Sequence, residues 1–295
     1  MTSADTTSPE QETVLILRPS RGFAVLNLRD LWIYRELVFF LTWRDLKVRY
    51  RQTALGAAWA ILVPVVEMVV FTVLFGEIAQ LSSEGIPYAI FNFAALLPWG
   101  IFSKGLNDAG RSLVNNRNMI TKVYFPRLVI PVASIGGGLA DFAIGFIVLI
   151  GLVAYFNFSP LSTYTFTLRP ALLTLPLFLL LALVTTLGVS LWFSALNVTY
   201  RDVGYALPFV TQVWFFLTPI IYSSSEILEK LPQGLRWIYA INPMVGVVEG
   251  FRWALLGTET APGVLTLISA LVSLLVLVSG LFYFRRMERT FADEI

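Results

Sequence analysis

The chain has 295 residues, of which 57% are hydrophobic and only 14% are charged, and its formal net charge is +2. Because a water-soluble domain carries about a quarter charged residues, this composition excludes an ordinary soluble fold and indicates a membrane protein. The chain has no Cys and no His. Their absence excludes disulfides and thiolate metal sites, and it removes the commonest metal ligand and general base.

Residues 1–26 are expected to form a cytoplasmic tail. The first part of this tail, Met1 to Gln11, is polar and lacks a basic region followed by an apolar run. We therefore expect no cleavable signal peptide, and insertion is assigned to the first spans themselves.

Residues 27–53 are predicted to form an amphipathic interfacial helix. Apolar side chains recur at spacings of 3, 4 and 7, which places six of them on one helix face: Leu28, Trp32, Phe39, Trp43, Leu46 and Tyr50. Two Trp and a Tyr on one face, with basic residues elsewhere, are typical of a helix in the headgroup region. Such a helix either only anchors the first span or also presents its basic face to an anionic lipid head or a cytoplasmic partner.

Residues 54–295 are predicted to form one transmembrane domain, so the fold class is an all-α membrane protein. A hydrocarbon core about 30 Å thick needs about 20 helical residues. Six apolar stretches approach that length: Trp59–Ile78, Tyr88–Leu106, Leu128–Phe156, Ala171–Leu196, Tyr205–Tyr222 and Val264–Phe284. The fifth stretch contains Pro208 and Pro219, so we expect it to be kinked or partly re-entrant.

The distribution of basic residues orients the chain in the membrane. Lys and Arg accumulate on the side that is not translocated. Of the 21 basic residues, 17 lie before span one, between spans two and three, between spans four and five, or after span six. We therefore expect a multi-pass protein of the cytoplasmic (inner) membrane with both termini in the cytoplasm.

Two of the predicted spans contain an acidic residue, Glu67 in the first and Asp141 in the third. Such groups usually face protein or water and have a partner, because a charge at mid-bilayer is costly. No Lys or Arg within a span is expected opposite either one, so neither partner is identified. Glu67 is either protonated and hydrogen-bonded between helices or lines a conduit. Nearby, Gly136, Gly137 and Gly138 predict close helix packing.

Four separated stretches carry recognisable motifs: RDLKVRYRQTALGAAWAILVPV (Arg44–Val65), NNRNMITKVYFPRLVIP (Asn115–Pro131), NVTYRDVGYALPFVTQVWFFLTPIIYS (Asn197–Ser223) and YAINPMVGVVEGFRWALLG (Tyr239–Gly257). Together they resemble permease subunits of ABC-type polysaccharide exporters, which export lipid-linked O-antigen, capsule or teichoic-acid chains. The similarity covers nearly the whole chain after about Thr13. Several matches in the family order are more specific than one short motif.

The resemblance implies a homodimer of six-span subunits, completed by two copies of a separate ATP-binding subunit. The sequence contains no GxxxxGK[ST] phosphate loop, so we expect no catalytic residue and no ATP hydrolysis in this chain. ATP and Mg²⁺ are expected on the partner. Membrane lipids and a lipid-linked polysaccharide are the other expected partners, with no nucleic acid, metal or cofactor bound by the chain itself.

In the family, the link between spans two and three carries a coupling helix that docks on the ATP-binding subunit. By motif this loop maps onto Asn115, Asn116, Arg117, Lys122, Tyr124, Phe125, Pro126 and Arg127. The alternative is a solvated basic loop. In the other cytoplasmic link, Arg201 and Asp202 either form a local ion pair or contact the ATPase, and we favour the ion pair.

The resemblance also implies that residues 223–259 dip back into the outer leaflet as short gate helices between spans five and six. An apolar gate would prevent ions from leaking when no polymer is present. The candidate gate residues are Leu235, Ile238, Tyr239, Met244, Val248 and Phe251. The alternative is a plain surface cap.

Sugars expose C–H faces on which aromatic rings stack, so aromatic residues near span ends are candidates for channel lining. They are Trp99, Phe102, Tyr155, Phe156, Trp214, Phe215 and Phe216. Aromatic residues also enrich at membrane interfaces whatever the cargo, so lipid contact is the alternative. Because lipid-carrier phosphates are anionic, the candidates for headgroup contact at the cytoplasmic entrance are Lys47, Arg49, Arg51 and Lys104.

Three other functions compete with polysaccharide export. An ABC exporter of a drug or small lipid is disfavoured by the motifs at 115–127 and 239–257. A membrane glycosyltransferase needs clustered acids or His at one membrane face, whereas the acids here are scattered. An ion-coupled transporter needs several paired intramembrane charges or paired broken helices, which the sequence does not show.

Overall fold

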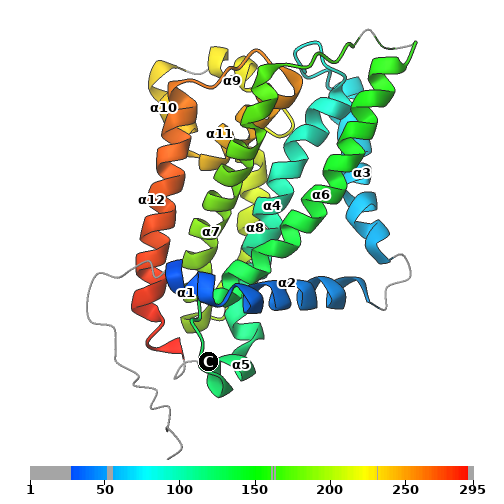
Figure 1. The fold of residues 1–295 in the computed structure, drawn as a ribbon. Coiled ribbons are helices and arrows are strands. Elements are labelled where there is room, and N and C mark those ends of the chain that lie inside the picture. Colours follow the sequence, from blue (N-terminus) through cyan, green and yellow to red (C-terminus); the bar gives the residue numbers. More distant parts are fainter. Residues whose placement is uncertain (1–27, 52–55, 161, 163, 231, 292–295) are drawn as a thin grey trace, which may run out of the picture.

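The computed structural model describes residues 28–51, 56–160, 162, 164–230 and 232–291. In these ranges the chain forms a bundle of helices without strands (Figure 1). The all-α prediction is therefore confirmed for the described part, whereas the predicted tail 1–26 lies outside it.

Five helical segments are long and apolar enough to cross a membrane. They are α3 (Trp59–Phe71) with its π-helical continuation Thr72–Ile78, α4 (Tyr88–Asn115), α6 (Val129–Phe158), α7 (Leu175–Thr199) with the preceding 3-10 turn Pro170–Thr174, and α12 (Val264–Met287). This makes the chain a multi-pass membrane protein. Four of the predicted spans agree closely with these helices, but α4 continues nine residues beyond its predicted end at Leu106.

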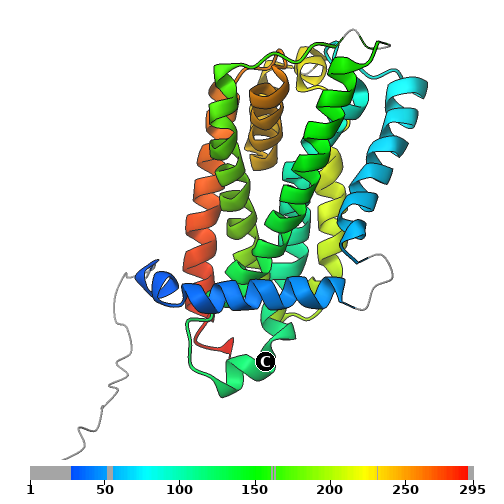
Figure 2. The ribbon, with the colours of Figure 1, turned by 45° about the vertical axis from the view of Figure 1, so that its right-hand side comes forward.

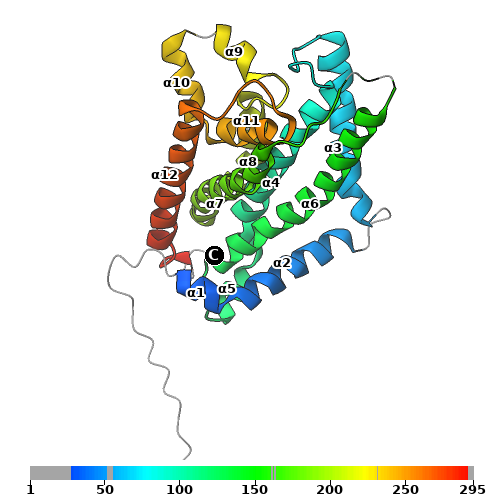
Figure 3. The same cartoon turned by 45° about the horizontal axis from the view of Figure 1, so that its top comes forward.

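The fifth predicted span differs from the structure. Helix α8 (Val203–Leu217) has only 15 residues, about 22 Å at a rise of 1.5 Å per residue. The prediction of a span to Tyr222 is wrong because Thr218–Tyr222 forms a turn. Three further helices follow this turn: α9 (Ser224–Lys230), α10 (Gln233–Ile241) and α11 (Pro243–Leu256). Figure 3 shows α11 inside the bundle, where it packs against α4, α7 and α12.

The predicted interfacial helix is divided into α1 (Leu28–Ile33) and α2 (Arg35–Tyr50), which are separated at Tyr34. Figure 2 shows α2 lying across the end of the bundle, roughly perpendicular to the long helices. Leu41 is buried against the bundle, and the Thr42 hydroxyl donates to the Ala133 carbonyl at 2.9 Å. The aromatic residues Trp32, Phe39 and Trp43 are exposed, as a lipid-facing surface requires.

The three consecutive glycines of α6 each face a different neighbour, which confirms that they allow close packing. A Cβ at Gly136 would lie 2.5 Å from Cγ2 of Thr42 on α2, and one at Gly137 would lie 3.3 Å from the Arg49 guanidinium. One at Gly138 would lie 3.4 Å from the backbone of Ile101 on α4. These glycines therefore set how closely α2 and α4 approach α6.

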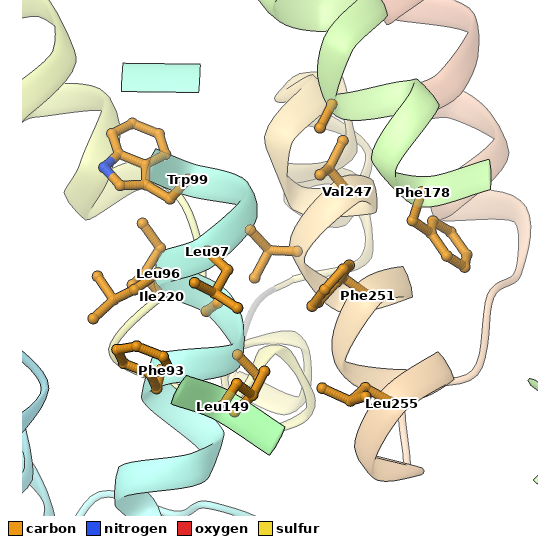
Figure 4. Packing of buried hydrophobic residues seen from close by; sticks show 14 of the residues in the cluster. Phe93, Leu96, Leu97, Trp99, Leu149, Phe178, Ile220, Val247, Phe251 and Leu255 are labelled. Atoms are coloured by element: carbon orange, nitrogen blue, oxygen red, sulfur yellow. The ribbon is translucent and has the colours of Figure 1, made fainter. Parts of the chain in front are cut away.

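The main hydrophobic core is built around α11. Figure 4 shows side chains of α11 lying among residues of α4, α6 and α7; the labelled residues include Val247, Phe251, Leu255, Leu97, Leu149 and Phe178. A second core at the end that carries α2 joins Leu41 to the start of α6 and to the end of α12. Short helix α5 (Arg117–Lys122), α1 and the last described residues all lie at this same end (Figure 1).

The turn after α8 exposes backbone carbonyls inside the bundle, and side chains satisfy them. Arg252 of α11, which is 0% exposed, donates to the carbonyls of Phe91, Pro219, Ile220 and Tyr222 at 2.5–3.3 Å. Its guanidinium carbon also lies 3.7 Å from the ring centroid of Phe91. Within a bilayer such irregular backbone is tolerated only when protein groups satisfy it.

Two other polar side chains complete this network. Tyr88 donates from its hydroxyl to the Ile221 carbonyl at 2.5 Å. Asn242 donates to the Leu217 carbonyl at 3.0 Å, while its own oxygen caps the N-terminus of α11 at Met244 N and accepts from Trp214 Nε1 at 2.8 Å. The side-chain amide of Asn242 therefore joins the last turn of α8 to the start of α11.

Arg252 has an ionic partner in this setting. The carboxylate of Glu249 lies 3.6 Å from its guanidinium. An arginine side chain stays protonated in proteins, so Arg252 keeps all of its donors.

Gly188→Ala is expected to lower the free energy of unfolding by about 1–3 kcal/mol. The added Cβ would lie 2.7 Å from N and 2.8 Å from Cα of Leu277 on α12, and backbone cannot turn aside as a flexible side chain does. Thermal unfolding of the purified protein measures the loss. Gly151→Ala is the matched control because nothing lies within 4 Å of its Cβ; equal unfolding temperatures for both variants would contradict the assignment.

Arg252→Leu is expected to cost about 3–5 kcal/mol, because it leaves a buried carboxylate and several buried carbonyls without their donor. Adding Glu249→Gln should recover only part of this loss, since the carbonyls of the 218–222 turn stay unpaired. Denaturant unfolding of the single and double variants measures both effects. Lys230→Leu, at an exposed residue paired only with Glu226, should be nearly neutral; an equally stable Arg252→Leu protein would refute the role.

Candidate functional site

A cavity of about 900 Å³ lies between α3, α4, α6 and α8. Its wall combines aromatic, polar and charged side chains: Trp59, Phe71, Trp99, Phe142, Phe215 and Phe216; Ser103, Asn107, Thr211 and Gln212; and Arg49, Glu67, Lys104 and Asp141. Helix α3, which forms one side of this cavity, is mostly exposed along its length. The cavity therefore combines apolar and polar groups, as ligand-binding sites in proteins do.

The structure divides the seven predicted channel-lining aromatics. Trp99, Phe215 and Phe216 line the cavity, and the rings of Trp99 and Phe215 lie 5.6 Å apart in an edge-on arrangement. Phe102 is fully buried in the core, where its ring lies 4.9 Å from that of Trp214.

The other two predicted aromatics lie near the far end of α6. Tyr155 is exposed, and Phe156 packs partly buried against the main core. Neither residue lies on the cavity wall.

A cluster of four charged residues occupies one part of the cavity region. Arg49 of α2 contacts Asp108 of α4 through one guanidinium nitrogen and lies 3.1 Å from Asp141 of α6 through the other. Lys104 of α4 contacts the same Asp141 oxygen. We refer to Arg49, Lys104, Asp108 and Asp141 as the charge cluster.

The charge cluster corrects the expectation that no basic residue faces Asp141. Two of them do, one from within the predicted second span and one from the interfacial helix. Asp108 was missed because the second span was expected to end before it. The spacing of the two residues could have identified Asp108, because Lys104 and Asp108 are four residues apart and therefore share a helix face.

The remaining predicted headgroup contacts are placed differently from one another. Lys47 and Arg51 are exposed on α2 or just beyond it, whereas Arg49 and Lys104 are ion-paired.

Glu67 lines the cavity from α3, which agrees with the second of its two predicted roles. Arg44 was not singled out by the sequence, yet it donates to Asn116 at 2.9 Å and pairs with Asp45.

The predicted coupling loop contains a helix, α5, with buried anchors and exposed charges. Ile120 and Phe125 are buried in the second core, while Asn115, Arg117, Lys122 and Tyr124 are exposed. Pro126 follows, partly buried. Tyr124 is 78% exposed, more than an aromatic residue in a folded loop normally is, and so presents a ring to any partner at this end.

Arg127, in contrast, is committed within the chain. Its backbone nitrogen donates to the Glu288 carboxylate at 3.2 Å, its guanidinium donates to the Glu288 carbonyl, and it lies 6.0 Å from the Phe291 ring. It fastens the end of α12 to the segment between α5 and α6.

The link between α7 and α8, which was predicted to be cytoplasmic, does not show the favoured ion pair. Arg201 and Asp202 are both exposed, and no salt bridge between them is among the ion pairs of the described chain. Arg111 of α4 holds the start of α8 instead, donating to the Gly204 carbonyl at 3.0 and 2.6 Å.

The predicted gate residues fall into two groups. Met244, Val248 and Phe251 of α11 are buried in the main core, whereas Leu235 and Ile238 of α10 are exposed.

Tyr239, which is part of α10, joins that helix to α9. Its hydroxyl lies 2.8 Å from that of Ser224 on α9. Burial raises the pKa of Tyr239, and Tyr222 and Glu249 act in the same direction, so the hydroxyl remains protonated and holds α10 to α9.

Comparison with known proteins agrees with this architecture. The family model described as "ABC-2 type transporter" matches residues 36–256. The chain is 30% identical over 272 residues to the O-antigen export system permease protein RfbA of Myxococcus xanthus, which covers 91% of this chain and 98% of that protein. It is 25% identical over 258 residues to RfbA of Klebsiella pneumoniae, covering 88% and 94%.

A polysialic acid transport protein is similar as well. The polysialic acid transport protein KpsM of Escherichia coli is 25% identical over 248 residues, covering 83% of this chain and 91% of KpsM. The family match spans α2 to α11, and thus both the cavity and the charge cluster. The chain belongs to the ABC-2 type transporter family and is a multi-pass membrane permease.

Proposed function

We propose that this chain is the channel-forming subunit of an ABC exporter that moves a lipid-linked polysaccharide, specifically O-antigen, outward across the cytoplasmic membrane. The observation that carries the proposal is the cavity, whose aromatic rings and polar groups line one wall of the membrane domain. The O-antigen permeases among the relatives support the cargo. Export of a capsule-type polysaccharide is the second candidate, favoured by the similarity to KpsM.

The proposal assigns ATP hydrolysis to a separate subunit. The sequence contains no GxxxxGK[ST] loop, the feature that cradles nucleotide phosphates in such ATPases. ATP and Mg²⁺ are therefore assigned to two copies of an ATP-binding partner. They would dock at the end that carries α5, where Arg117, Lys122 and Tyr124 are exposed, and this end is assigned to the cytoplasm with both termini.

A second copy of the chain is proposed to close the cavity. Glu67, Asn107 and Gln212 lie on a wall bordered by α3 and α8, whose outer faces are apolar and exposed. A carboxylate that faced lipid directly would be costly. A homodimer in which α3 and α8 of each subunit face the partner would place these polar groups around a shared, water-filled passage.

In this arrangement six segments would cross the membrane, with α8 as the short fifth one and α11 reaching down to meet it. Exposed Leu235 and Ile238 on α10 would form the outer gate, while Met244, Val248 and Phe251 fix α11 in the core. Lys47 and Arg51 would meet lipid headgroups at the cytoplasmic entrance.

Export itself tests the proposal. A strain that lacks its own O-antigen exporter should display surface O-antigen when it receives this chain with the ATP-binding subunit encoded beside it. The P-loop Lys→Ala variant of that subunit is the control and should abolish display. Failure of the two proteins to co-purify, or export that needs no ATP hydrolysis, would end the proposal.

Tyr124→Ala is expected to uncouple ATP hydrolysis from export while leaving folding intact, because its ring is exposed next to α5 and supports no internal contact that the structure records. Export should fall about tenfold, the loss of roughly 1.4 kcal/mol of contact energy. ATPase activity and surface glycan, measured on the same membranes, separate coupling from folding.

Arg127→Ala is the matched comparison. Because Arg127 binds the end of α12, this variant should lower the unfolding temperature, which Tyr124→Ala should not. Normal export by Tyr124→Ala would remove Tyr124 from the coupling surface.

A further inference from the structure

We propose that the charge cluster is a displaceable latch: the phosphate of an anionic lipid headgroup replaces the two aspartates as partner of Arg49 and Lys104, and so releases the end of α2 from α4 and α6. The inference rests on the proposed function for the identity of the cargo. It adds a binding site for the lipid phosphate and a mechanism by which binding of the cargo releases the end of α2.

The latch joins three helices through one shared carboxylate. Arg49 reaches from α2 to Asp108 on α4 and, at 3.1 Å, to Asp141 on α6, while Lys104 on α4 contacts the same Asp141 oxygen. Two cations and two carboxylates balance, so the closed state carries no net charge within the cluster. An arriving phosphate adds negative charge to the cluster. Arg49 and Lys104 then bind the phosphate in place of an aspartate carboxylate.

The cluster is accessible enough for such an exchange. The side chains of Arg49, Asp108 and Lys104 are 28%, 38% and 39% exposed, and that of Asp141 is 13% exposed. Arg49, Lys104 and Asp141 are also part of the cavity wall. Partly exposed ion pairs contribute little to stability because water screens them, so a competing anion needs only modest extra affinity.

The two cations suit a phosphate better than they suit separate carboxylates. A guanidinium presents parallel N–H donors to two oxygens of one phosphate, and an ammonium adds a point charge beside it. Because Arg49 and Lys104 already converge on one Asp141 oxygen, both lie within reach of a single anionic group at that position.

Release would affect only the end of α2. Its middle is held by buried Leu41 and by the 2.9 Å hydrogen bond from Thr42 to Ala133, two helical turns before Arg49. Only eight residues lie between the end of α2 at Tyr50 and the start of α3 at Trp59. Detaching Arg49 therefore releases the last turn of α2, which precedes α3, the helix on the exposed side of the cavity.

Gly137 supports the closed position. A Cβ at this residue would lie 3.3 Å from both terminal nitrogens of Arg49, so the guanidinium rests directly on the backbone of α6. A side chain there would push the guanidinium off Asp141, which makes Gly137 part of the latch geometry.

The test uses the whole exporter, this chain with its ATP-binding subunit, in lipid nanodiscs. Because the chain has no Cys, Val48→Cys on exposed α2 and Arg286→Cys at the exposed end of α12 carry spin labels whose separation reports the latch. The probes are undecaprenyl diphosphate, phosphatidic acid and inorganic phosphate, each added to phosphatidylcholine discs. Binding of the radiolabelled probe is measured on the same samples.

Both phosphate-bearing lipids are expected to change the distance between the spin labels in the wild-type background. If only undecaprenyl diphosphate changes this distance, the lipid carrier is identified as the source of the phosphate. Asp108→Asn should show the changed separation without ligand and bind the lipid more tightly. Arg49→Gln should weaken lipid binding by about tenfold or more, as expected for loss of a bidentate charged contact. Arg49→Lys, which keeps the charge but loses the fork, should fall between, and thermal unfolding checks that each variant is folded.

Two results would overturn the latch. One is unchanged lipid affinity in Arg49→Gln, and the other is an equal response to inorganic phosphate, which would assign the site to a free anion. These outcomes are distinct from failure of the proposed function. Lipid-dependent release without ATP-driven export refutes the exporter alone, whereas normal export by Arg49→Gln refutes the latch alone.

Discussion

The structure depends on satisfying a short piece of non-helical backbone inside an apolar bundle. Helix α8 stops at Leu217, and the carbonyls that follow would be unpaired in a hydrocarbon environment. Arg252, Asn242 and Tyr88 supply the donors from α11, from its N-cap and from α4. Three elements distant in sequence are therefore locked together at one level of the bundle.

This lock explains why a helix as short as α8 occurs in a bundle of longer ones. Helix α11 lies inside the bundle, and its face toward α4, α6 and α7 is apolar and buried. The cost of burying Arg252 is offset by four carbonyl acceptors, Glu249 and the face of the Phe91 ring. This end of the bundle also carries α10, whose Leu235, Trp237, Ile238 and Ile241 are exposed.

The other end of the bundle is held by polar contacts of a different kind. There α2 is fixed by Leu41 and Thr42, but its last turn is held by ion pairs that water can reach. Deeply buried hydrogen bonds resist exchange, whereas partly exposed ion pairs are readily replaced. The two ends thus differ in how easily they rearrange, and the end of α2 that the latch is proposed to release lies at the weaker one.

The sequence by itself determined the all-helical membrane class, four of the long helices and the tight packing at Gly136, Gly137 and Gly138, whereas the short helix at 117–122 was expected only from the family resemblance. These features follow from local composition, length and side-chain size, which act within a few residues. Only the tertiary structure decided that α8 ends at Leu217, that Asp141 pairs with Arg49 and Lys104, and that Arg252 is fully buried. Each of these depends on groups 25 or more residues apart, whose meeting is set by how the helices pack.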